Sequence, residues 1–210
     1  MDKVLSQLGG RICLFDGAMG TTLQAMGLQP GELPELWSLT HREDLVDIHR
    51  SYLQAGADFL KTNTFGANRF KLEGTGHSVE EVVSAGVRNA QQAVEECGHG
   101  LVFLDIGPTG KLLRPLGELD FEDAVSVFGE MVHAGVMAGA DAILIETMSD
   151  IYEAKAALLA AKEYSDLPVF VTMTFDQDGK LLTGGSIEVA VAVLEGLGAD
   201  AIGFNCGLGP

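Results

Sequence analysis

The tripeptide Gly-Ala-Asp occurs three times in this sequence, each time between a helix-like segment and a short apolar run. The copies occupy residues 56–58, 139–141 and 198–200. Glycine just past a helix end favours the left-handed conformation that caps a helix. A short apolar run after such a cap is typical of a strand buried on both faces of a parallel sheet. A repeated unit of helix, tight turn and strand therefore predicts an α/β protein.

Apolar runs and helical periodicity divide the chain into six strands and five crossover helices. The strands are expected at residues 12–15, 59–64, 101–104, 142–148, 169–175 and 201–206. The helices are expected at residues 40–55, 78–97, 121–138, 150–162 and 187–197. Two of these helices begin with sequences typical of a capping box, Thr40–Glu43 and Ser78–Glu81. The right-handed crossover rule makes all six strands parallel.

The order of these elements favours a barrel over a doubly wound sheet. No Gly-x-Gly-x-x-Gly follows the first strand, and no phosphate-binding loop of the Gly-Lys-Ser/Thr type is present. We therefore predict an α/β fold of the TIM (β/α)8 barrel type. Such barrels usually need about 250 residues, so about six of the eight βα units are expected in this chain. No linker divides it, and residues 1–210 are expected to form one barrel domain.

Composition and charge exclude several classes of protein. The net charge of -17 argues against nucleic-acid binding, because phosphates require a basic surface. No apolar stretch approaches the roughly 20 residues that span a membrane, and the first residues lack the features of a secretory signal. We therefore expect a cytoplasmic protein. The three cysteines, Cys13, Cys97 and Cys206, are too few and too widely spaced for a disulfide framework.

Two carboxylates end otherwise apolar strands, where parallel α/β folds place their ligand sites. Asp16 follows the first strand and Glu146 lies near the end of the fourth. A buried carboxylate needs a partner, and the chain offers few cations nearby, so the ammonium group of a ligand would satisfy both. The alternative is that each carboxylate caps the next helix. Thr62 and Asn63 end the second strand and can offer hydroxyl, amide and backbone donors to a ligand carboxylate.

Cys206 ends the sixth strand, and two interpretations of it are open. Buried cysteines are most often small hydrophobic residues, but a thiolate at this edge could bind zinc at about 2.3 Å. Cys13 and Cys97 are expected to pack or to lie on the surface. The five histidines fall on helices or their flanks, which argues against a histidine-based hydrolase; they are His41, His49, His77, His99 and His133.

Five ordered motifs make the chain resemble the homocysteine S-methyltransferase family, most closely its cobalamin-dependent members. They are Asp16–Thr21, Thr62–Gly66, Asp105–Gly110, Glu146–Thr147 and Gly203–Pro210. They occur in order at the expected strand ends, and the resemblance covers essentially the whole chain.

The resemblance implies a TIM barrel that binds zinc and homocysteine. By analogy, Cys206 would be a zinc ligand and the catalytic cysteine, and Asp16 and Glu146 would hold the substrate ammonium. Backbone amides near Gly17 and Thr62, together with Asn63, would form the pocket for the substrate carboxylate. Zinc would bind the homocysteine thiol and remove its proton, which makes it a nucleophile. The methyl group would arrive on a cobalamin held by a separate corrinoid-binding domain or protein and recharged from a methyltetrahydrofolate-binding one.

The chain departs from the family pattern at its end. The family supplies two further zinc ligands from a Gly-Gly-Cys-Cys motif, which is absent from these 210 residues. We therefore expect a longer reading frame to carry it, and expect the 210-residue chain alone to lack stoichiometric zinc and methyltransferase activity. Two alternatives stay open: an enzyme that uses S-methylmethionine or betaine without a corrinoid, and a non-catalytic homocysteine-binding module.

Overall fold

A single parallel sheet organises the molecule, which the computed structural model describes over residues 3–207. Its strands pair in sequence order, β1-β2-β3-β4-β5. The strands are β1 (Phe59–Lys61), β2 (Leu101–Ile106), β3 (Ala142–Met148), β4 (Val169–Met173) and β5 (Ala201–Phe204). A doubly wound sheet reverses its strand order at a switch point, whereas a barrel wall adds each new strand beside the last. The sequential order is that of a partial TIM barrel, as the sequence predicts.

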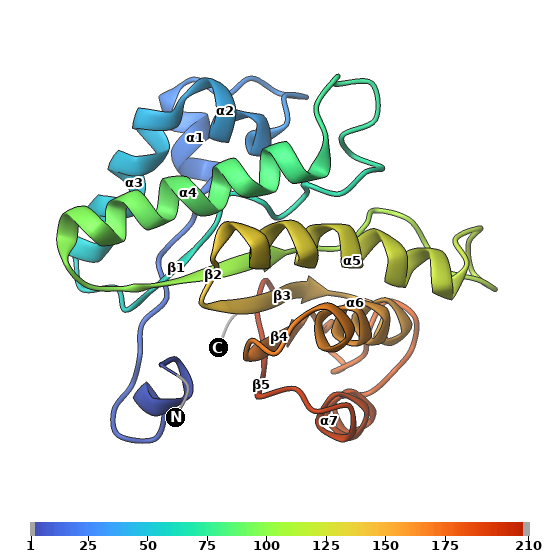
Figure 1. Ribbon diagram of the computed structural model, residues 1–210. Coiled ribbons are helices and arrows are strands. Elements are labelled where there is room, and N and C mark those ends of the chain that lie inside the picture. The colour runs from blue at the N-terminus through green and yellow to red at the C-terminus, as the bar shows by residue number, and fades with distance from the viewer. Residues whose placement is uncertain (1–2, 208–210) are drawn as a thin grey trace.

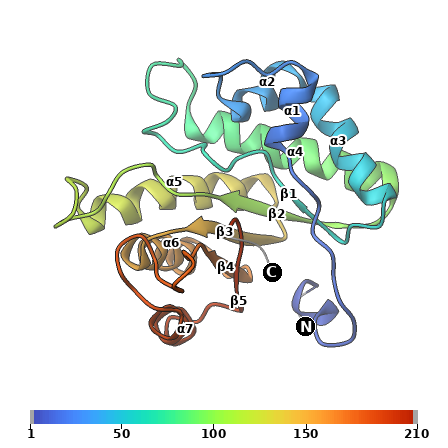
Figure 2. The same cartoon turned by 180° about the vertical axis from the view of Figure 1, so that it is seen from behind.

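The helices lie on one face of this sheet (Figures 1 and 2). The α-helices are α1 (Gly20–Met26), α2 (Trp37–Thr40), α3 (Arg42–Gln54), α4 (Val79–Cys97), α5 (Phe121–Ala138), α6 (Ile151–Tyr164) and α7 (Ile187–Gly196). Two short 3-10 helices, η1 (Leu5–Gln7) and η2 (Pro34–Leu36), complete the described elements. This is the arrangement of a barrel wall. Helices cover its outer face, and its other face lines the barrel interior.

Two apolar layers pack on the two faces of the sheet. The larger layer joins the helices to the outward-facing strand residues, among them Leu60, Val102 and Ile143. The smaller layer covers the inner face and includes a group of aromatic rings, whose centroids lie 4.9–5.2 Å apart between neighbouring members. Its rings are Phe15, Phe59, Phe103 and Phe170. Strand alternation produces this division, because successive side chains point to opposite faces.

The expected first strand is reduced to a single bridge. Residues 12–15 run beside β1 as predicted, but only Phe15 pairs with it, in a parallel bridge to Phe59. Ile12 and Leu14 are 84% and 54% exposed. Within the described residues this segment has a neighbour on one side only, so it lacks the second ladder that would extend the pairing. The prediction of six strands is therefore wrong by this one element.

The helices agree more closely with their predicted limits. The expected helix at residues 121–138 coincides with α5, and the expected strand at residues 142–148 coincides with β3. Ser78 caps α4 by accepting a hydrogen bond from the Glu81 N–H at 3.1 Å. The capping box at Thr40 is wrong, because His41 precedes α3 and the Thr40 hydroxyl donates to the Leu36 carbonyl instead.

The three Gly-Ala-Asp copies form the same hydrogen-bonded connection, here called an aspartate joint, at the start of three strand segments. Each glycine has a positive φ, at 105°, 92° and 84° for Gly56, Gly139 and Gly198. Each aspartate then exchanges two hydrogen bonds with one residue of the preceding segment: its N–H donates to that residue's carbonyl, and its carboxylate accepts that residue's N–H. The pairs are Asp58 with Leu14, Asp141 with Val102, and Asp200 with Val169, at 2.8–2.9 Å. The repeat therefore aligns the start of each strand with the strand before it.

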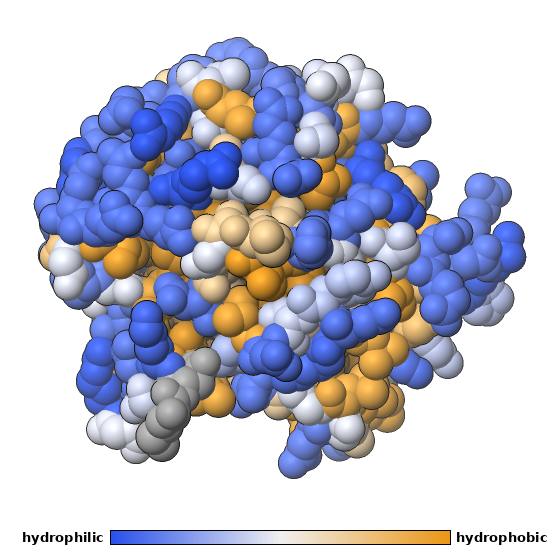
Figure 3. Space-filling model, in the orientation of Figure 1, coloured by the Kyte–Doolittle hydropathy of each residue, from blue (hydrophilic) through white to orange (hydrophobic). Residues whose placement is uncertain are grey.

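The outer edge of β5 carries an apolar surface. Phe204 is 82% exposed, and Ile187 and Val191 on α7 are also exposed. Figure 3 shows hydrophobic side chains gathered toward the lower right of the molecule, where Figure 1 places α6 and α7. No helix in the described part of the chain is long and apolar enough to cross a membrane.

Candidate active site

Charged side chains lie directly above the aromatic layer on the inner face of the sheet. The apolar residues that precede them on this face are Phe59, Phe103 and Leu144. The charged residues two positions further along the same strands are Lys61, Asp105 and Glu146. Since side chains alternate along a strand, all three point into the barrel interior near its carboxyl edge. This edge is where barrel enzymes place their sites.

Lys61 supplies a cation that the sequence analysis did not anticipate. Its Nζ lies 3.3 and 3.5 Å from the two carboxylate oxygens of Glu146. The side chains are 24% and 13% exposed, so the ion pair is largely removed from solvent. Burial opposes charging of Lys61, but the surrounding carboxylates outweigh it and raise its pKa. The expectation of few cations near the two carboxylates is therefore wrong for Glu146.

Asp16 is buried beside this pair, with one oxygen unpartnered among the described residues. Its side chain is 2% exposed. Oδ2 accepts the Lys61 backbone N–H at 3.1 Å, and Oδ1 has no hydrogen-bond partner. Burial raises the pKa of Asp16 to about 7, and that hydrogen bond opposes the shift. Asp16 does not cap α1, because Met19 precedes that helix and no side chain caps it.

Asp105 repeats this pattern on the neighbouring strand. The residue is 5% exposed, and its Oδ1 has no partner among the described residues. Burial and the nearby Glu146 carboxylate raise its pKa well above the usual range. Glu146 does not cap the helix that follows it, since Asp150 caps α6. Three carboxyl groups and one ammonium therefore share the inner face, and two of the carboxyl groups leave an oxygen unpaired.

Helix α3 supports the turn that carries Asp16. His49 is completely buried, and its Nδ1 lies 4.0 Å from Asp16 Oδ2. Three residues further along, the Tyr52 hydroxyl donates to the Ala18 carbonyl at 3.0 Å. A Cβ on Gly17 would lie 2.7 Å from the Tyr52 ring, so a larger residue there would require the Tyr52 side chain to move. Although the sequence analysis placed all the histidines away from the strand ends, the fold brings His49 to the site.

Thr62 and Asn63 are buried at the end of β1 and form hydrogen bonds within the protein. The Thr62 hydroxyl accepts the Asp105 backbone N–H at 3.0 Å and lies 2.6 Å from the Thr64 hydroxyl. The Thr62 N–H donates to the Phe103 carbonyl in the sheet. The Asn63 amide donates to the Pro34 carbonyl at 2.7 Å. In this structure both side chains join β1 to its surroundings, and Gly17 is exposed.

Cys206 lies in a corner with unusual backbone angles and several hydrogen bonds. Cys206 and Thr147 are the two non-glycine residues with positive φ in the described chain, at 50° and 61°. Such angles are rare for a β-branched residue and concentrate at functional sites. Asn205 joins them, because its amide donates to Thr147 Oγ1 at 2.9 Å and its oxygen accepts the Thr172 hydroxyl at 3.1 Å. Cys206 Sγ lies 3.9 Å from Thr147 Oγ1.

The exposure of Cys206 does not fit the first of its two interpretations. Cys206 is exposed, so it is not a buried hydrophobic residue. Cys13 and Cys97 are half-buried and pack against the two apolar layers, as expected. Within residues 3–207, no three His, Cys, Asp or Glu side chains lie close enough to hold a metal ion.

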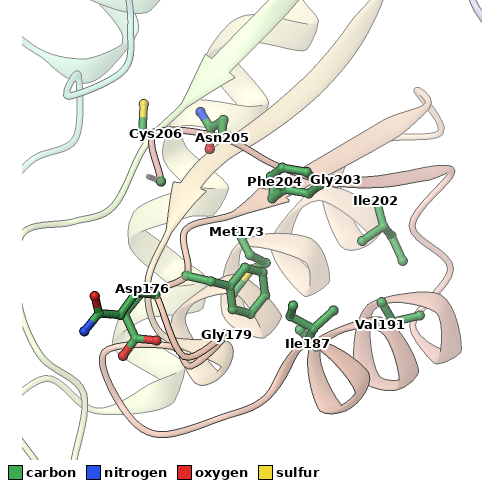
Figure 4. A pocket seen from close by; sticks show the side chains of 14 residues that line it. Met173, Asp176, Gly179, Ile187, Val191, Ile202, Gly203, Phe204, Asn205 and Cys206 are labelled. Carbon is green, nitrogen blue, oxygen red and sulfur yellow. The ribbon is translucent and has the colours of Figure 1, made fainter. Parts of the chain in front are cut away.

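A cavity of about 690 Å³ adjoins this corner. Figure 4 shows Asn205 and Cys206 at one end of it and Ile187, Val191 and Ile202 at the other. The carboxylates of the inner face do not line it. It lies along the exposed edge of β5, and its walls are mostly apolar, so it adjoins the charged site without being part of it.

Comparisons with known proteins agree on one family. The homocysteine S-methyltransferase family model matches residues 13–210. Methionine synthase of Mycobacterium tuberculosis is 34% identical over 224 aligned residues, which cover 99% of this chain and 19% of that protein. The Mycobacterium leprae methionine synthase is 33% identical over 99% of this chain and 18% of its own length. The chain thus spans about a fifth of the length of these curated relatives.

A solved structure of similar fold comes from Escherichia coli. The oxidized form of the homocysteine methyltransferase MmuM is 25% identical to this chain and superimposes with a TM-score of 0.85. The match covers 97% of this chain and 76% of MmuM. Its metallated form gives a TM-score of 0.83 over 96% of this chain.

Proposed function

The chain belongs to the homocysteine S-methyltransferase family, and from this premise we propose that residues 1–210 form a homocysteine-binding barrel domain of a methyltransferase. The reaction would transfer a methyl group to the homocysteine thiol and give methionine. The roles of Asp16, Gly17, Thr62, Asn63, Glu146 and Cys206 are part of this proposal.

The unpaired carboxyl oxygens on the inner face carry the proposal. Asp16 Oδ1 and Asp105 Oδ1 are buried without partners in the described chain, and Glu146 lies nearby with Lys61 as its only ion-pair partner there. A buried carboxylate is costly unless it is paired or protonated. The ammonium group of an α-amino acid is a cation that could pair with these oxygens, and the site holds three carboxyl groups but one ammonium, that of Lys61. This balance supports binding of a substrate such as homocysteine.

Asp16→Asn and Glu146→Gln test this assignment. Each lost charge-assisted hydrogen bond is expected to cost about 1.5–3 kcal/mol, which weakens homocysteine binding by about 10- to 150-fold. Titration calorimetry of the full-length protein measures the affinity. Glu163→Gln is the matched control, because it removes one carboxylate from an exposed position on α6. Unchanged affinity in both site variants would refute the assignment.

We further propose that Cys206 is one ligand of a zinc ion whose other ligands are not among the described residues. Its exposed thiol at the carboxyl edge, held beside Thr147 by the Asn205 network, supports a role as a ligand. Zinc bound by thiolates would favour the thiolate form of a coordinated substrate thiol at neutral pH. The chain's own residues would bind and orient the amino acid so that its thiol lies near Cys206.

The methyl donor is proposed to be a methylated cobalamin on a separate domain or protein, recharged from methyltetrahydrofolate. The similarity to methionine synthases supports this choice. The alternatives are S-methylmethionine or betaine as donor, for which the similarity to MmuM is relevant, and a binding module without catalysis. Supplying each donor separately to the full-length protein with homocysteine, and measuring methionine, separates the three. We also propose a cytoplasmic location, which cell fractionation tests.

A further inference from the structure

His49 is an anomaly among the buried polar residues. Its side chain is completely buried, and neither ring nitrogen has a hydrogen-bond partner among the described residues. Buried polar groups are nearly always hydrogen-bonded, so an unpaired one calls for an explanation. The nearest carboxylate is that of Asp16, at 4.0 Å from Nδ1, and it also has an unpaired oxygen. The unpaired ring thus faces Asp16 Oδ2, which accepts the Lys61 backbone N–H, whereas the unpaired oxygen of that carboxyl group is Oδ1.

The surrounding geometry directs His49 toward the candidate site. His49 and Tyr52 are three residues apart on α3 and therefore share one face of the helix. Tyr52 contacts Gly17 and bonds to Ala18, while His49 approaches Asp16. One helix face therefore supports three successive residues of the turn. A relative shift of about 1 Å between His49 and Asp16 would bring Nδ1 and Oδ2 to hydrogen-bond distance.

We propose that His49 is a positioning residue, whose Nδ1–H donates a hydrogen bond to Asp16 Oδ2 when a ligand ammonium pairs with the Asp16 carboxylate. This inference rests on the proposed function. The Lys61 backbone N–H already donates to the same oxygen at 3.1 Å, and His49 is positioned to supply the second donor. A carboxylate that accepts several N–H bonds keeps its charge more easily in a buried site.

The imidazole can supply a hydrogen bond but not a charge. Burial lowers the pKa of His49 to about 4, so the ring is neutral near pH 7. The titratable groups around Asp16 are Lys61 on β1, Asp105 on β2 and Glu146 on β3, and carboxyl groups outnumber the ammonium. A ligand ammonium would add a second positive charge that favours the ionised form of Asp16. Homocysteine binding should strengthen as the pH rises through about 7, where Asp16 loses its proton.

Three substitutions of His49 separate hydrogen bonding from packing. His49→Leu fills the space without a donor, His49→Asn places an amide N–H near the Nδ1 position, and His49→Gln places one near Nε2. We expect His49→Leu and His49→Gln to weaken homocysteine binding at pH 7 about 10-fold or more, and to move the pH midpoint of binding upward. His49→Asn should retain most of the affinity and the original midpoint. Calorimetric titrations of the full-length protein between pH 5.5 and 9 measure both quantities.

Tyr52→Phe is the matched control, because it removes another contact between α3 and the same turn without changing a donor to Asp16. It should leave the pH midpoint in place. In parallel, the ¹⁵N shifts of the His49 ring should show a protonated, hydrogen-bonded Nδ1 once homocysteine is added.

The outcomes distinguish this inference from the function on which it rests. If the unchanged protein fails to bind homocysteine, the proposed function is wrong. If it binds and His49→Leu keeps both affinity and midpoint, the positioning role is wrong. Equal losses in the Asn and Gln variants, or a midpoint shift in Tyr52→Phe that matches His49→Leu, would also overturn it. If His49→Leu does not fold, the comparison of Asn with Gln still decides.

Discussion

Replacing Asp16 by asparagine should stabilise the protein at neutral and alkaline pH even as it weakens ligand binding. The Asp16 side chain is 2% exposed, and its Oδ1 lacks a partner among the described residues. Burial raises its pKa from 3.8 to about 7. The folded state therefore disfavours the ionised form of Asp16, and the free energy of unfolding falls when the pH is high enough to ionise it. Asparagine keeps the shape and the Lys61 hydrogen bond but carries no charge.

The pH window follows from the sign of the shift. Below about pH 4, Asp16 is protonated in the folded and unfolded states alike, so ionisation of Asp16 contributes nothing to the difference between the two proteins. Between pH 4 and pH 7 the unfolded chain releases this proton and the folded chain keeps it, so the stability of the unchanged protein falls as the pH rises. A shift of about three pKa units corresponds to about 4 kcal/mol at 1.36 kcal/mol per unit. The unpaired amide of the variant should cost about 1–3 kcal/mol at every pH.

Urea unfolding of both proteins at pH 4, 6 and 8 measures this difference. The free energy of unfolding of Asp16→Asn, relative to the unchanged protein, should rise by about 3–4 kcal/mol from pH 4 to pH 8. The amide cost cancels, because it is the same at each pH. A difference that stays constant over this range would refute the argument that burial raises the pKa of Asp16 in the folded protein. A difference with the opposite slope would mean that Asp16 gains charge on folding.

Three further predictions concern the carboxyl edge and the exposed surface. Cys206→Ser in the full-length protein should abolish stoichiometric zinc, because serine supplies no soft thiolate; elemental analysis that still finds one zinc per chain would remove Cys206 from the site. Asn205→Ala should lower the free energy of unfolding by about 1–3 kcal/mol, since it removes the hydrogen bonds that the Asn205 side chain forms with Thr147 and Thr172; urea unfolding measures the loss, and no loss would contradict the network. The 210-residue chain by itself should self-associate through the edge of β5, and Phe204→Ser should reduce its mass by light scattering; a monodisperse monomer before the change would contradict this expectation.

Local patterns were enough to predict most of the fold. The limits of α5 and β3 follow from glycine caps and uninterrupted apolar runs. The segment at residues 12–15 has the same composition as a strand but forms only one bridge. Strand formation depends on neighbours on both sides, and composition does not report them. The error therefore arises where tertiary context decides the pairing.

The charged layer was partly visible in the sequence. Asp16 and Glu146 stood out because each ends an apolar run. Lys61 and Asp105 lie two positions beyond inward-facing phenylalanines, and strict alternation along β1 and β2 would have placed them on the same face. His49 could be expected to be buried, because Leu45 and Leu53 flank it at helical spacing. Its approach to Asp16 depends on how α3 packs on the sheet, which no local pattern contains.

The aspartate joints after Gly56, Gly139 and Gly198 have a consequence for the order in which the chain assembles. Each aspartate bonds to the segment immediately before it, over separations of 44, 39 and 31 residues. Each joint connects segments that are neighbours in the order of the chain, and short sequence separations favour rapid folding. Each new strand can therefore be locked in register as soon as its own helix has formed. On a ribosome, the sheet would grow at one edge, one unit at a time, in the direction of synthesis.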